Sequence, residues 1–153
     1  MPTGRHPAGL LLALLLLSCA GEDLRFSTPA TTFRTYREAL TRGDAETSWL
    51  CLSSGYRQLE FEGNADRWAA HIEGPSVSRE VDRLEIGQET EINDRLAFLQ
   101  FDPSTVGPGR APFYYFLYEA EGWRITTHLD SLFRVELEAA IERDEFSLPR
   151  LRR

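Results

Sequence analysis

Three side chains in the last third of the chain have the chemistry of a catalytic site. His128 and Asp130 stand two residues apart in the stretch ITTHLD, so in a strand they project from the same face. A histidine or a carboxylate can act as a general base, and a tyrosine hydroxyl can stabilise negative charge that develops on a substrate oxygen. With a two-residue turn at Glu121-Gly122, Tyr115 lies directly opposite His128.

The same stretch has a simpler interpretation, which the sequence favours. Arg124, Thr126, His128 and Asp130 alternate along the strand, and a polar stripe of this kind is typical of the solvated face of a half-exposed sheet. No residue matches a known catalytic motif, so we assign no catalytic residue. The candidate residues of a pocket or of the polar stripe are Tyr114, Tyr115, Tyr118, His128 and Asp130.

Motifs for other kinds of chemistry are absent from the sequence. There is no Gly-x-Ser-x-Gly, His-Glu-x-x-His or Cys-x-x-Cys pattern and no phosphate-binding loop. Beyond residue 18 the histidines are His71 and His128, which excludes a three-histidine zinc site. The number of histidines still allows a zinc site with two histidines and one carboxylate, but nothing in the sequence supports such a site. We therefore predict neither a metal nor a cofactor.

The N-terminal segment has the layout of an export signal. Residues 1–6 carry one arginine, and residues 8–17 contain no polar side chain, whereas a membrane-spanning helix needs about 20 apolar residues. A charged start, a short apolar run and a small-residue exit are typical of a secretory signal peptide. The alternative to the lipid anchor described next is ordinary cleavage after Ala20 and a secreted protein.

The exit Leu16-Leu17-Ser18-Cys19 resembles the lipobox of bacterial lipoproteins. The resemblance implies a signal peptide of residues 1–18, a lipid on Cys19 and an acylated (palmitate-type) amino terminus. Residues 19–27 would then form a lipidated tether to the membrane. An aspartate after the cysteine can retain lipoproteins at the inner membrane, and Ala20 stands there instead. We therefore expect a lipid-anchored protein of the bacterial cell envelope, at the outer rather than the inner membrane, and not a cytoplasmic one.

Composition excludes some partners. The chain has 153 residues, contains no lysine, and has a formal net charge of −7. Loss of Arg5 with the leader would make it −8, which is unsuited to nucleic acid and to electrostatic docking on anionic lipid. The membrane contact is therefore assigned to the lipid alone, and Cys51, the remaining cysteine, is predicted to be a small buried residue.

Capping residues place the helices in the first half of the chain. Thr28-Pro29 predicts a helix that Gly43 ends, and Asp44 opens a second helix that Gly55 ends. Residues 58–61 could form a short strand. Asn64 predicts a third helix over residues 65–72, closed by Gly74-Pro75.

A change of period indicates strands in the second half. From Val77 apolar residues recur with a period of two, and Asn93-Asp94 and Glu121-Gly122 predict two hairpin turns. Residues 131–143 are helical again, with one apolar face. That face consists of Phe133, Leu137, Ala140 and Ile141.

This order of elements, together with short phrases, resembles the cone-shaped superfamily of ketosteroid isomerase, scytalone dehydratase and nuclear transport factor two. The matching phrases are Ala39-Leu40-Thr41-Arg42-Gly43-Asp44 at the end of the first helix and Gly122-Trp123-Arg124-Ile125 in the last strand. The resemblance implies an α+β fold over residues 28–130, in which N-terminal helices pack on a curved antiparallel sheet. Residues 131–153 are an added C-terminal helix and tail.

The sheet has apolar side chains on both faces, so both faces need cover. Phe113, Tyr115 and Leu117 alternate with the core-facing set, which includes Tyr114, Tyr118 and Leu129. We predict that helix 131–143 folds onto the face of Tyr115. Members of the superfamily often dimerise through that face, so a homodimer through the sheet is the alternative.

Two functions follow from these observations. The first is a non-catalytic envelope lipoprotein that binds an apolar small ligand or a protein partner. The second is a small isomerase, dehydratase or hydrolase of the superfamily. A filled cone favours the first, and an open pocket that encloses a tyrosine with a histidine or carboxylate favours the second.

Overall fold

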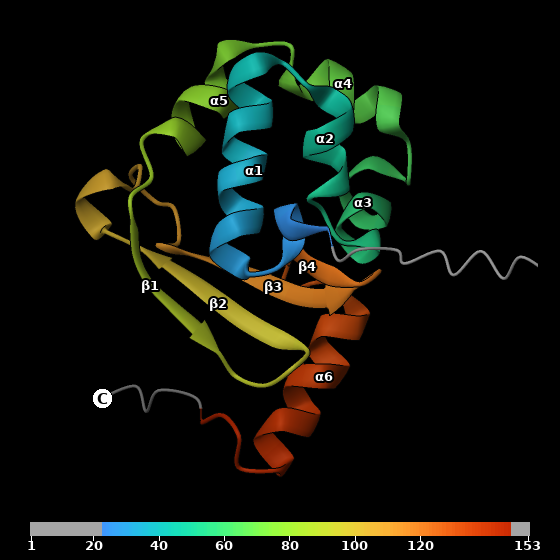
Figure 1. The fold of residues 1–153 in the computed structure, drawn as a ribbon, viewed down its shortest axis with the longest axis vertical. Helices are drawn as coiled ribbons and strands as arrows, with labels where there is room; N and C mark the ends of the chain where they lie inside the picture. The colour runs from blue at the N-terminus through green and yellow to red at the C-terminus, as the bar shows by residue number, and fades with distance from the viewer. Residues whose placement is uncertain (1–22, 148–153) are drawn as a thin grey trace, which may run out of the picture.

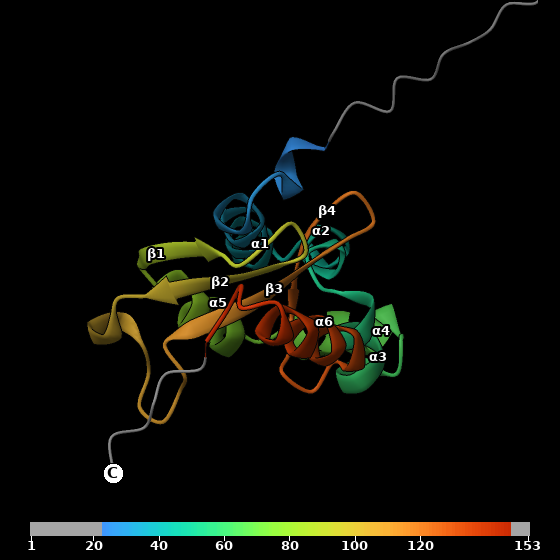
Figure 2. The ribbon, with the colours of Figure 1, turned by 90° about the horizontal axis from the view of Figure 1, so that it is seen from below.

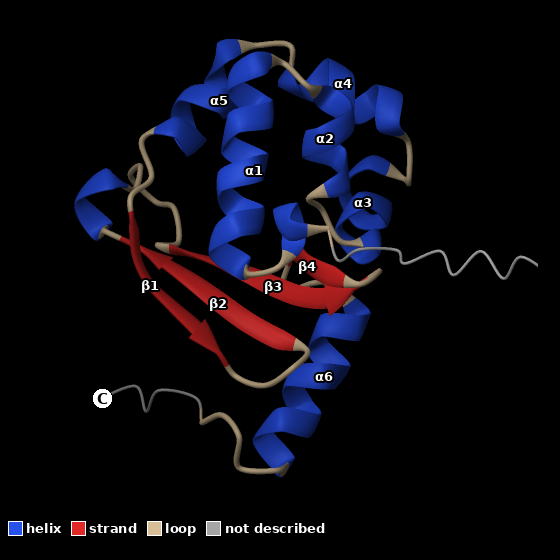
Figure 3. Ribbon diagram, in the orientation of Figure 1, coloured by secondary structure: helices blue, strands red, loops and turns tan. Residues whose placement is uncertain are grey.

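The computed structural model describes residues 23–147, which form helices on both sides of a four-stranded antiparallel sheet (Figures 1 and 3). The helical elements are η1 Leu24–Phe26, α1 Pro29–Arg42, α2 Ala45–Leu50, α3 Ser54–Phe61, α4 Ala65–Ile72, α5 Pro75–Asp82, η2 Pro103–Thr105 and α6 Ser131–Glu142. The strands, in sheet order, are β1 Ile86–Glu91, β2 Leu96–Phe101, β3 Phe113–Glu119 and β4 Gly122–Thr126. The predicted α+β class is confirmed. The predicted signal peptide and Cys19 lie outside the described residues.

The predicted caps of α1, α2 and α4 are confirmed. Thr28 accepts a hydrogen bond from the Thr31 amide at the start of α1, and Gly43 ends this helix in the left-handed conformation with φ of 68°. The Asp44 and Asn64 side chains likewise accept backbone amides at the starts of α2 and α4. These bonds satisfy amides that have no partner within the helix.

Two predictions for residues 54–82 are wrong. The expected strand at residues 58–61 belongs to α3, which starts one residue before Gly55 and is capped by the Ser53 hydroxyl on the Tyr56 amide. The period of two expected from Val77 is also wrong, because Pro75 opens the helix α5 instead of closing the helix before it. Both segments are therefore helices that cover the sheet, and the strands begin only at Ile86.

The hairpin between β3 and β4 turns one residue earlier than predicted. Glu119 pairs with Gly122, and the two turn residues are Ala120 and Glu121, both with positive φ. This places Thr126 opposite Tyr115, so the predicted pairing of His128 with Tyr115 is wrong. The shift is two residues, so each side chain keeps its predicted face.

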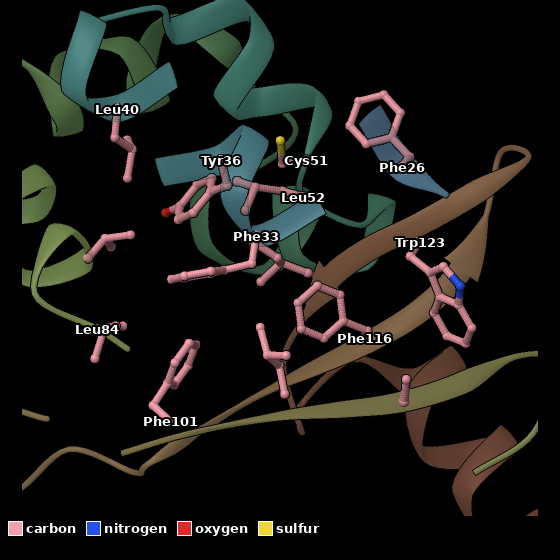
Figure 4. Packing of buried hydrophobic residues seen from close by; sticks show 14 of the residues in the cluster. Phe26, Phe33, Tyr36, Leu40, Cys51, Leu52, Leu84, Phe101, Phe116 and Trp123 are labelled. Atoms are coloured by element: carbon pink, nitrogen blue, oxygen red, sulfur yellow. The ribbon is translucent and has the colours of Figure 1, made fainter. Parts of the chain in front are cut away.

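The sheet separates two apolar clusters. On one face, α1 to α5 enclose the main core with alternate residues of the strands, as Figure 1 shows above the sheet. Figure 4 shows part of this core, in which Phe33 of α1 lies against Phe101 of β2 with ring centres 4.8 Å apart. Leu96 and Leu117 project to the other face and belong to the second cluster.

The helix α6 covers this second face, as predicted. Phe133 is 1 % exposed, and it packs with Ala140, Leu96 and Leu117. Figure 2, viewed from below, shows α6 in front of the sheet and α1 behind it, so the two helices lie on opposite sides. The face available for a homodimer is therefore partly occupied by the chain itself, and dimerisation stays a prediction.

The described part of the expected tether packs on the domain. Phe26 of η1 is 3 % exposed, and the Arg124 guanidinium carbon lies 3.8 Å from the centre of its ring. The folded body thus begins near Leu24 and not at Thr28. Within residues 23–147, no helix combines the length and apolar character that crossing a membrane requires.

Candidate functional site

The predicted polar stripe is not solvated. Arg124, Thr126 and Asp130 are all buried, and β4 ends at Thr126, so His128 and Asp130 do not belong to the strand. His128 is exposed, with its ring centre 6.3 Å from that of Tyr115. The structure therefore brings His128 near Tyr115 but separates it from Asp130, whose side chain points into the protein.

Asp130 holds three elements together. Its Oδ2 accepts hydrogen bonds from the hydroxyls of Ser53, at 3.1 Å, and Thr126, at 2.8 Å. Its Oδ1 accepts the Leu132 amide at the start of α6. These bonds link the start of α3, the end of β4 and the start of α6. With both carboxylate oxygens occupied, Asp130 is a structural residue and is not available as a general base.

A cavity of about 730 Å³ lies elsewhere, between the sheet and the helices α3 to α5. Its walls come from α1, α3, α4, α5, the loop after η2 and the strands β3 and β4. Because β4 stops at Thr126, the lining includes residues from both faces of β3, Tyr114 and Tyr115. The space between the sheet and α3 to α5 is therefore open on this side and not filled by side chains.

Aromatic rings form part of the cavity wall, beside polar and charged side chains. Seven lining residues are aromatic: Tyr36, Tyr56, Phe61, Trp68, Phe113, Tyr114 and Tyr115. Trp68 is fixed by the hydrogen bond that its indole N–H donates to the Ser48 hydroxyl at 2.9 Å. Tyr36 stacks on Trp68 with ring centres 6.2 Å apart, and Phe61 meets Trp68 edge-on at 5.1 Å. This part of the wall is preformed.

Three phenol groups bring polarity into the cavity. Tyr36, shown in Figure 4, is 6 % exposed, and neither its hydroxyl nor those of Tyr56 and Tyr114 form a hydrogen bond within the described residues. Burial raises the pKa of Tyr36, Tyr56 and Tyr114. The three phenols are therefore neutral at pH 7 and can each donate or accept a hydrogen bond.

Charged groups lie at the rim. Arg110, in the loop before β3, makes a two-point ion pair with Glu80 of α5: its Nε lies 3.1 Å from Oε1 and its Nη2 donates to Oε2 at 3.3 Å. Glu60 is exposed at the same cavity. His71 is also exposed, with its ring centre 5.4 Å from that of Phe61. The rim thus combines two carboxylates with one guanidinium and one imidazole.

Sequence reasoning found part of this site. Of the five candidates, Tyr114 and Tyr115 line the cavity, whereas Tyr118 packs edge-on against Trp123 with ring centres 5.5 Å apart. His128 and Asp130 are not among the lining residues. The residues that were missed are Tyr36, Tyr56, Glu60, His71, Glu80 and Arg110.

Neither a metal site nor a relative identifies this cavity. Over residues 23–147 no group of three or more histidine, cysteine, aspartate or glutamate side chains is placed to hold a metal ion. No family model, no curated protein and no solved structure matches the chain. The functional argument therefore rests on the geometry and chemistry of the cavity.

Proposed function

We propose that this protein is a lipid-anchored lipoprotein of the bacterial envelope whose cone-shaped domain binds a small, mainly apolar molecule. The observation that carries the proposal is the open cavity of about 730 Å³ with its aromatic wall. Sites for small ligands usually enclose about 300–1,000 Å³ and combine apolar walls with a few polar groups. Three neutral phenols and the charged rim supply those polar groups.

A probe-binding experiment tests the ligand-binding part of the proposal. Nile red, an uncharged apolar dye, should bind with increased fluorescence. Val77 is half-buried and lines the cavity, so Val77→Trp should fill space and abolish the signal. Val135 is 62 % exposed on α6, and Val135→Trp is the matched control. Equal dye binding by Val77→Trp and the wild type, or no binding by the wild type, would contradict the proposal.

The anchor is tested separately. The motivation is the short apolar run that ends in Leu16-Leu17-Ser18-Cys19. The wild type should partition into detergent and Cys19→Ser should stay in the aqueous phase. If both behave as soluble proteins with an amino terminus at Gly21, the protein is secreted and not anchored.

The open cavity with its tyrosines is the feature that the sequence analysis expected of the enzyme alternative, whereas a filled interior was expected of a non-catalytic protein. Catalysis also needs a general base within about 2.6–3.2 Å of the substrate atom that carries the proton, or connected to that atom through one water molecule. Among the lining carboxylates, Glu80 is paired with Arg110 and Glu60 is exposed. His71 is exposed and forms no hydrogen bond within the described residues that would orient its ring. Binding is therefore better supported than catalysis.

A further inference from the structure

The charges that line the cavity do not balance. Glu60 and Glu80 contribute two carboxylates, and Arg110 is the one arginine in the lining. Arg110 is committed to Glu80 through both Nε and Nη2. Glu60 has neither a hydrogen bond nor an ion pair within residues 23–147. Apart from His71, the lining therefore carries one excess negative charge, in a chain whose formal net charge is −7.

The wall adds to this negative character. The face of an aromatic ring is electrostatically negative and attracts cations, most strongly for tryptophan and tyrosine. The ring centres of six of the seven lining aromatics lie within 7 Å of the centre of another lining ring. Phe61 and Trp68, for example, are 5.1 Å apart. A ring that is fixed before binding loses little conformational freedom when a ligand arrives.

We propose that the cavity selects a small organic cation, an alkylammonium or quaternary ammonium group on an apolar body. This inference rests on the proposed binding function and names its ligand class. The apolar body packs against the half-buried rings of Tyr56 and Tyr114, and the cationic group lies near Glu60 and Glu80. An anionic ligand is disfavoured because it would have to take Arg110 from Glu80 and approach the free carboxylate of Glu60.

A matched pair of probes isolates the charge of the ligand. Benzyltrimethylammonium and neopentylbenzene have nearly the same shape and differ by one positive charge, and phenylacetate serves as the anion. Each probe competes with Nile red at pH 8 and low salt. We expect the cation to bind at least about fivefold more tightly than the neutral probe. Added salt should weaken binding of the cation and leave the neutral probe unchanged.

Two variants at the rim should act in opposite directions. Glu80→Gln removes a carboxylate and should weaken benzyltrimethylammonium about two- to fivefold, whereas Arg110→Gln should strengthen it by a similar factor. Neither variant should change the affinity for neopentylbenzene. Both side chains are partly exposed, and circular dichroism and thermal unfolding verify that the variants fold.

The outcomes separate this inference from the function on which it rests. Failure of Nile red to bind the wild type contradicts the proposed function itself. Dye binding with equal affinity for the two matched probes, or tighter binding of phenylacetate, overturns the cation preference alone. The cation preference is also overturned if Glu80→Gln changes the affinity for both matched probes by the same factor, because the carboxylate would then act through structure and not through charge.

Discussion

Replacement of Gly55 by alanine should destabilise the protein, although the change improves the intrinsic helix propensity of α3. A Cβ atom at Gly55 would lie 2.1 Å from Oδ2 and 2.2 Å from Cγ of Asp130. These separations are far below van der Waals contact, and no other residue approaches as closely. The Asp130 side chain would have to leave its buried site.

The cost follows from the bonds that Asp130 makes. Loss of its cap on α6 costs about 1 kcal/mol. Loss of the acceptor shared by Ser53 and Thr126 costs about 1–3 kcal/mol, at the lower end because these two hydroxyls also bond to each other at 3.0 Å. Alanine in a helix returns about 0.5–1 kcal/mol. We therefore expect Gly55→Ala to lower the free energy of unfolding by about 2 kcal/mol.

A double-mutant cycle makes this reasoning refutable. Asp130→Ala alone should cost about 3 kcal/mol through the same lost bonds. In that background Gly55→Ala meets no carboxylate, so it should become neutral or stabilising by about 0.5 kcal/mol. Urea unfolding followed by tryptophan fluorescence measures all four proteins. If the costs of the two substitutions are additive, or if Gly55→Ala stabilises the wild-type protein, the close approach to Asp130 does not cause the destabilisation.

Three further predictions concern other parts of the fold. Phe133→Ala should cost about 3 kcal/mol or more in urea unfolding, since this ring is 1 % exposed, whereas Val135→Ala on the exposed face of α6 should change stability by under about 0.5 kcal/mol. Arg124→Ala removes the guanidinium over Phe26 and should speed amide hydrogen exchange of residues 24–26, while α4 stays protected. Burial raises the pKa of Cys51 to about 12, so this thiol should react slowly in the native protein. In a variant whose other cysteine is changed to serine, an aromatic disulfide reagent at about pH 8 should label the native protein slowly and the protein in concentrated urea rapidly. Rapid labelling of the native protein would contradict this.

The helices that were predicted correctly are those whose caps are local. Thr28, Asp44 and Asn64 each bond an amide two or three residues ahead, so a short stretch of sequence contains the whole interaction. Residues 54–61 also have such a cap, Ser53 on the Tyr56 amide. It was missed because Gly55 was interpreted as the end of the preceding helix.

Gly55 and Gly122 show why glycine misled the prediction. Gly55 was assigned to the end of a helix and Gly122 to a hairpin turn, yet neither has a positive φ. A Cβ at Gly122 would lie 2.6 Å from Cβ of Phe26 and 2.7 Å from Nη1 of Arg124, so the glycine is needed where η1 crosses the strand. Ala120 and Glu121 make the turn instead. Glycine is required at these positions because segments distant in sequence pack closely there, and the local sequence pattern does not indicate that packing.

The cavity also could not be predicted from the sequence. The ion pair at its rim joins residues thirty positions apart, Glu80 on a helix that was predicted as strand and Arg110 in a loop. The aromatic residues were visible, but their spacing equally fits a packed core, as it does for Phe33 and Phe116. Whether a ring fills space or borders it depends on how far α3 to α5 stand from the sheet.

The composition of the cavity explains why these helices can stand off. The outer face of the sheet is partly covered by α6. On the inner face α1 packs directly on β2 and β3 through Phe33, whose ring centre lies 4.8 Å from that of Phe101 and 5.8 Å from that of Tyr114. Closing the remaining space with aliphatic side chains would leave the phenol groups of Tyr36 and Tyr114 buried without partners, at about 1–3 kcal/mol each. Hydrophobic collapse is thus opposed where the phenols converge, and a ligand that combines apolar surface with a polar group satisfies both requirements.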